Sequence, residues 1–92
     1  MGWYRCLIVG ENFQLEVDGE RRPMGFAVTR YVEASSEKEA QAGAMDMLRG
    51  DPVLQIPQGT PGMERARIFF EAIEPAHEPG ANSGFAYFPM ER

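Results

Sequence analysis

Hydrophobic and polar residues alternate in the first third of the chain. Residues 3–9 are rich in aromatic and branched side chains, which predicts a strand that ends at Gly10. Residues 13–17 are hydrophobic at every second position, which predicts a second, half-buried strand. The pair Asp18-Gly19 supplies the positive φ angles of a tight hairpin turn. We therefore expect the chain to turn back here into a third strand.

The third predicted strand spans residues 25–33, and it carries hydrophobic residues on both of its faces. After it, the pattern changes to helical spacing from about Ser36 to Arg49. Ser36 and Glu39 have the spacing of a capping box, in which a hydroxyl and a carboxylate satisfy free backbone N–H groups. Gly50 ends the helix. The predicted apolar stripe is made mostly of small residues, so the helix should lie close to the sheet: Ala40, Gly43, Ala44, Met47 and Leu48.

The second half of the chain begins with a loop at residues 51–63, which is rich in proline and glycine. Residues 65–74 fit either a strand or a helix. A strand is favoured because three consecutive positions are apolar and Pro75 follows the segment. A second loop at 75–83 leads to a short aromatic strand at residues 84–88.

This order of elements predicts an α+β fold. We expect a mixed, mainly antiparallel sheet of four to five strands with one main helix on one face, loosely similar to ferredoxin-like folds. The strand–helix–strand unit should be right-handed, which makes the strand at 65–74 parallel to the one at 25–33 if they share a sheet. Residues 1–92 are expected to form a single domain, as is usual for this length.

Composition narrows the classes of function. The net charge is −5 and the isoelectric point is about 4.8, so we expect no nucleic-acid binding, which needs a basic surface. Cys6 is the single cysteine, so no disulfide can form within the chain, which fits a reducing compartment. The apolar run from Cys6 to Val9 is too short for a signal peptide or a membrane span. We therefore expect a cytoplasmic protein that does not bind membranes.

Few residues suggest chemistry. Cys6 lies in a predicted strand without a neighbouring base, so we interpret it as a buried structural thiol. His77 is the single histidine, and one histidine beside carboxylates falls short of a closed metal site. Ser36 is explained by helix capping. We therefore predict no catalytic residues, no metal site and no cofactor.

Arg30 is the strongest candidate for a site. It shares a strand face with apolar residues, where an uncompensated charge is costly, so it needs an ion pair or a ligand. Glu71 and Glu16 are the expected partners for an ion pair. Tyr31 and Tyr87 combine an apolar ring with a hydroxyl, so Arg30, Tyr31 and Tyr87 are the predicted ligand-binding residues.

Surface counting predicts a homodimer. One helix covers at most about half of one face of a four- or five-stranded sheet. The strands, however, carry apolar residues on both faces. Phe69 and Ile73, for example, are expected on the face opposite to Ile68 and Phe70. The loops could cover part of the second face. Otherwise a second copy packs on this face or extends the sheet at residues 85–88.

The sequence therefore favours a small non-catalytic interaction or ligand-binding module that self-associates, with a small molecule or another protein as a further possible partner. The alternative is a small cofactor-free enzyme or small-molecule sensor. Its pocket would form at the dimer interface and use Arg30, Tyr31 and Tyr87.

Overall fold

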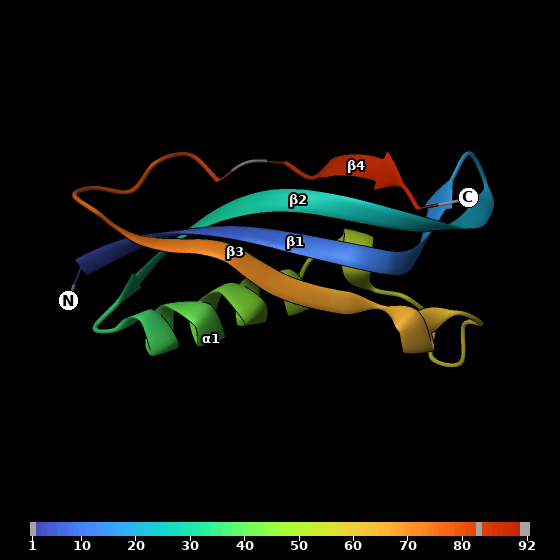
Figure 1. Ribbon diagram of the computed structural model, residues 1–92, viewed down its shortest axis with the longest axis horizontal. Coiled ribbons are helices and arrows are strands. Elements are labelled where there is room, and N and C mark those ends of the chain that lie inside the picture. The colour runs from blue at the N-terminus through green and yellow to red at the C-terminus, as the bar shows by residue number, and fades with distance from the viewer. Residues whose placement is uncertain (1, 83, 91–92) are drawn as a thin grey trace.

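Four strands and one helix form two layers (Figure 1) in a computed structural model that describes residues 2–82 and 84–90. The strands are β1 (Gly2–Val17), β2 (Glu20–Ala34), β3 (Arg67–Ala76) and β4 (Ala86–Pro89), and the helix is α1 (Glu37–Arg49). Two short 3-10 turns, η1 (Pro52–Leu54) and η2 (Met63–Arg65), lie in the loop between α1 and β3.

The sheet has the strand order β3-β1-β2-β4, and every pair of neighbouring strands in the described chain is antiparallel. The predicted α+β class with one main helix is confirmed, whereas the expected mixed sheet is antiparallel. The physical reason is that β1 lies between β2 and β3. These two strands run parallel, as predicted, but they are not neighbours.

Strand β1 joins the two strands that were predicted at residues 3–9 and 13–17. Its pairing with β2 shifts between Gly10 and Phe13, where Asn12 has a φ of 59°. Such an irregularity inserts unpaired residues and reverses which side chains face the core. Cys6 and Ile8 before it and Phe13 after it are therefore all buried on one face.

Strand β3 contains a second irregularity. Leu7 of β1 pairs with Ala72, but Ile8 pairs with Phe70, so Glu71 is an extra residue on β3. Phe70 and Ile73 consequently both pack against the core. The expectation that Ile73 lies opposite Phe70 is wrong for this reason. The strand itself is confirmed over the helix alternative.

The hairpin between β1 and β2 forms as expected. Asp18 and Gly19 have φ angles of 52° and 83°, which are the left-handed values that this turn requires. Strand β2 begins directly after the turn, at Glu20, and not at residue 25 as predicted.

Helix α1 begins and ends at the predicted residues. Ser36 is its N-cap, and the Ser36 hydroxyl accepts a hydrogen bond of 3.2 Å from the backbone N–H of Glu39. The Glu39 carboxylate accepts one from the backbone N–H of Ser35. A Cβ atom on Gly43 would lie 2.8 Å from Val32, so the helix packs closely on β2 there. Met47, predicted in the apolar stripe, is exposed.

The helix packs on one face of the sheet only, so the two faces differ in how much of their surface is buried. The face toward α1, which we call the covered face, holds the buried core, whose members are Cys6, Ile8, Phe13, Leu15, Phe26, Val28, Ala34, Ala40, Ala44 and Leu48. Leu54, Ile56 and Met63 from the loop after α1 also pack against this core. The opposite face, the open face, presents partly or fully exposed apolar residues: Trp3, Leu7, Val9, Ala27, Phe69, Ala72 and Phe88. In the described residues, no helix is long and apolar enough to cross a membrane.

Candidate functional site

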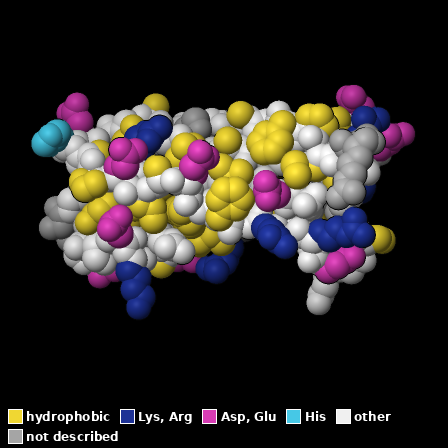
Figure 2. All heavy atoms as spheres, in the orientation of Figure 1, with side chains coloured by type: hydrophobic (Ala, Val, Ile, Leu, Met, Phe, Trp, Pro, Cys, Tyr) yellow, Lys and Arg dark blue, Asp and Glu magenta, His cyan; other side chains and the backbone are white. Residues whose placement is uncertain are grey.

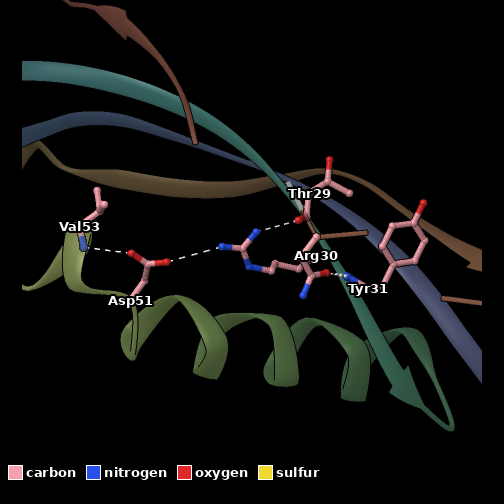
Figure 3. Close-up of polar contacts among 6 residues, drawn as sticks. Thr29, Arg30, Tyr31, Asp51 and Val53 are labelled. Atoms are coloured by element: carbon pink, nitrogen blue, oxygen red, sulfur yellow. Dashed lines mark hydrogen bonds and ion pairs between the residues drawn. The ribbon is translucent and has the colours of Figure 1, made fainter. Parts of the chain in front are cut away.

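Arg30 lies on the covered face of β2 and is only 8% exposed. Its Nη1 donates a hydrogen bond of 2.9 Å to the backbone oxygen of Thr29, and its Nη2 lies 3.6 Å from Oδ2 of Asp51. Figure 3 shows the guanidinium pointing toward Asp51. The guanidinium carbon also lies 5.6 Å from the centre of the Phe85 ring, which is within cation–π range. These contacts compensate the buried charge.

Asp51 follows the last turn of α1 directly in the sequence. It is the N-cap of η1, where its Oδ1 accepts a hydrogen bond of 2.9 Å from the backbone N–H of Val53. The other carboxylate oxygen is left to face Arg30. Glu71 and Glu16 were the expected partners, and this expectation is wrong. Glu71 belongs to β3, which β1 separates from β2, and Glu16 lies beside the hairpin turn.

Tyr87 enters from β4, where it pairs with Phe26 of β2. Its ring stacks on Phe85 at 6.0 Å between centroids, and Phe85 in turn meets Phe26 edge to face at 5.1 Å. Desolvation raises the pKa of the Tyr87 phenol, and the negative charge of Asp51 raises it further. The phenol therefore stays neutral at physiological pH.

A pocket of about 480 Å³ adjoins this cluster. It lies where the hairpin end of β1 and β2 meets η1 and β4, and its apolar lining residues are Leu15, Val17, Met24, Pro52, Val53 and Tyr87. Glu16, Arg21 and Gln55 complete the lining. The volume falls in the range of small-molecule sites.

The structure places the three predicted site residues on different faces. Arg30 and Tyr87 both contact Phe85 on the covered face. Tyr31 lies on the open face, where its backbone N–H donates a hydrogen bond of 2.8 Å to Asn82 and Gly80 approaches its ring. The loop between β3 and β4 thus covers Tyr31.

Sequence reasoning missed Asp51 and Phe85. Asp51 precedes a proline and lies in the segment that was predicted only as a loop rich in proline and glycine. An aspartate before a proline is also the signal for a capped turn, and that signal could have identified it. Phe85 lies in a short aromatic segment. Which face of the sheet its side chain contacts depends on where β4 pairs, and the sequence does not show this.

Other candidate groups remain separate. The Cys6 thiol is fully buried, and desolvation raises its pKa, so it is held in the neutral form. His77 is exposed in the loop after β3. In residues 2–82 and 84–90, no three histidine, cysteine, aspartate or glutamate side chains are grouped as metal ligands would be.

Comparison with protein-family models, with curated proteins and with solved structures gives no match. The loose similarity to ferredoxin-like folds therefore stays a prediction, and the function must be argued from the geometry of this chain.

Proposed function

We propose that this chain is a small non-catalytic interaction module that forms a homodimer through the open face of its sheet. The observation that carries the proposal is the row of apolar side chains on that face. Phe69 is 42% exposed and Phe88 is 37% exposed, and the Phe88 ring lies so close to Gly25 that a Cβ atom there would clash with it. Figure 2 shows hydrophobic side chains gathered along the middle of the molecule, with charged side chains between them and toward both ends.

The chain exposes more surface than a compact monomer of its size. The chain exposes 6003 Å², whereas the scaling of surface with mass gives about 5,400 Å² for a folded monomer of this size. The radius of gyration is 14.0 Å, compared with about 12.3 Å for a compact domain of this length. Both values exceed the expectation because the molecule is elongated, with extents of 41 × 21 × 21 Å, and this shape gives the sheet a long exposed face.

The described parts of the loops leave most of the open face uncovered. Leu54, Ile56 and Met63 of the loop after α1 pack against the core on the covered face. The loop after β3 covers Tyr31 at the edge near β4. The apolar residues of β1 and β3 on the open face, such as Val9 and Phe69, therefore need a different cover.

The charges at the two ends of the open face suit a second copy. Arg5 and Glu74 form an ion pair of 3.0 Å at one end, and Glu11 and Arg67 are cross-strand neighbours at the other. Each end thus carries one acidic and one basic side chain. In a twofold dimer, each end of one copy can meet the same end or the other end of its partner, and in both cases an acidic side chain can face a basic one.

A non-catalytic role is supported by the state of the reactive groups. The Cys6 thiol is buried and neutral, and the Arg30 guanidinium is engaged by Asp51, Thr29 and Phe85. The module therefore acts through its surface.

Light scattering on a dilution series tests the dimer. We expect a mass about twice the 10.3 kDa of the chain at high micromolar concentration. A mass of 10.3 kDa at that concentration, in low and in high salt alike, would overturn the proposal.

A pair of variants locates the interface. Phe69→Asp puts a charge among the apolar residues of the open face, on its edge strand β3, and should give a monomer. Met47→Asp is the matched control, because Met47 is similarly exposed but lies on α1. It should leave the dimer intact. A dimer that survives Phe69→Asp but not Met47→Asp would place the interface on the helix side.

A further inference from the structure

The pocket beside the Arg30–Asp51 pair is lined by residues of paired strands and of a capped turn. Leu15, Val17 and Met24 come from paired strands, and Pro52 and Val53 come from η1, which Asp51 caps. Tyr87 closes the wall from β4, with its ring held against Phe85. The walls are thus positioned before any ligand arrives, which lowers the entropic cost of binding.

The chemistry of the walls is mainly apolar with an aromatic surface. Tyr87 is 48% exposed although its ring is stacked on one side, so the other side of the ring is accessible. An accessible ring of fixed orientation favours a flat ring on the ligand. The neutral hydroxyl of Tyr87 can donate or accept one hydrogen bond.

The charges around the pocket compensate one another. Asp51, which adjoins the pocket through Pro52, is paired with Arg30. Glu16 and Arg21 of the lining are cross-strand partners, and Arg21 donates a hydrogen bond to the backbone oxygen of Gln14. A charged ligand would lose hydration without meeting an excess of opposite charge.

We infer that this pocket binds a small uncharged molecule that carries a flat ring system and one hydrogen-bonding group. This site lies on the covered face, whereas the proposed dimer uses the open face. Ligand binding and dimerisation are therefore separable properties of the chain.

Nuclear magnetic resonance titration of the full chain with indole tests the inference, with indole-3-acetate and tryptamine as charged analogues. We expect saturable shifts of the backbone amides of Val17, Met24 and Val53 with indole, and binding of both analogues at least about tenfold weaker, which corresponds to 1.4 kcal/mol. The absence of saturable shifts at these amides would overturn the site. Tighter binding of either charged analogue would overturn the uncharged class of ligand.

Three variants keep the test specific. Val53→Asp places a charge in the wall and should weaken indole binding at least about tenfold, while Met47→Asp should leave it unchanged, because both native residues are 38% exposed but only Val53 lines the pocket. Tyr87→Phe keeps the ring and removes the hydroxyl, so it should weaken binding about threefold to tenfold. Equal affinity in all three variants would overturn the inference.

The Phe69→Asp variant separates this inference from the proposed function. It should bind indole with unchanged affinity whether or not it has become a monomer. A loss of indole binding in this variant would show that the pocket depends on the dimer, and would overturn the independence of the two sites.

Discussion

The covered and the open face of the same sheet differ in how far their apolar side chains are buried. On the covered face, α1 and the loop after it bury Phe26, Ile8 and Val28 almost completely. On the open face, Val9 and Phe69 are held by the same strands but keep contact with solvent. Strand pairing fixes both sets of residues, and within residues 2–82 and 84–90 only the first set has a second layer above it.

The arginines of the two faces show the same contrast. Arg30 is buried beside Asp51 and Phe85, whereas Arg5 pairs with Glu74 in an exposed position. An ion pair in water contributes little to stability, while the loss of one partner from a buried pair is costly. We therefore expect the covered face to contribute more to stability than the open face.

The largest effect should come from truncating an aromatic side chain in the core. Phe26→Ala removes edge-to-face contacts with Phe13 and Phe85 and should lower the free energy of unfolding by about 3–5 kcal/mol. Phe69→Ala on the open face should cost less than about 1 kcal/mol in protein too dilute to associate. Urea denaturation measures both. Equal costs in dilute protein would contradict the difference between the faces.

The second comparison uses the two arginines. Arg30→Ala leaves the Asp51 carboxylate without its cation in a largely buried position and should cost about 2–4 kcal/mol. Arg5→Ala breaks an exposed ion pair and should cost at most about 0.5 kcal/mol. Urea denaturation at low protein concentration distinguishes these values, and a smaller cost for Arg30→Ala would show that the charge is not held as the geometry indicates.

The third prediction concerns the start of the helix that covers the core. Ser36→Ala removes the hydroxyl that accepts from the Glu39 N–H and should cost about 1 kcal/mol. Ser36→Asp keeps an acceptor at the cap and should stay within a few tenths of a kcal/mol of the native protein. A cost for Ser36→Ala that is indistinguishable from zero would mean that the cap lies elsewhere.

The smallest effect is a pH dependence at the same cap. Hydrogen bonds from the side chain and backbone of Ser35 lower the pKa of the Glu39 carboxylate in the folded state. Its contribution to stability is therefore complete above the unfolded pKa of about 4.3, and it is lost as the pH falls through the lowered folded value. Denaturation between about pH 5 and pH 2.5 should show a shallower loss of stability in Glu39→Gln than in the native protein. Identical slopes would contradict the cap geometry.

Local signals in the sequence were sufficient for the main elements. The Asp18-Gly19 turn, the Ser36 cap and the end of α1 each depend on the conformational preferences of a few adjacent residues, and each forms where the sequence predicts. The burial of Arg30 among apolar neighbours also follows from alternation along β2.

Features that depend on distant residues required the tertiary structure. The irregularities at Asn12 and Glu71 exist only relative to a partner strand, so the side chains beyond them could not be assigned to a face by counting along the chain. The partner of Arg30 was decided by where the loop after α1 brings Asp51. The pocket needs β4 docked beside β2. By itself, then, the sequence determined the hairpin turn and the helix, because these arise from neighbouring residues. Strand pairing, the partner of Arg30 and the pocket arise from contacts between distant segments, which only the fold defines.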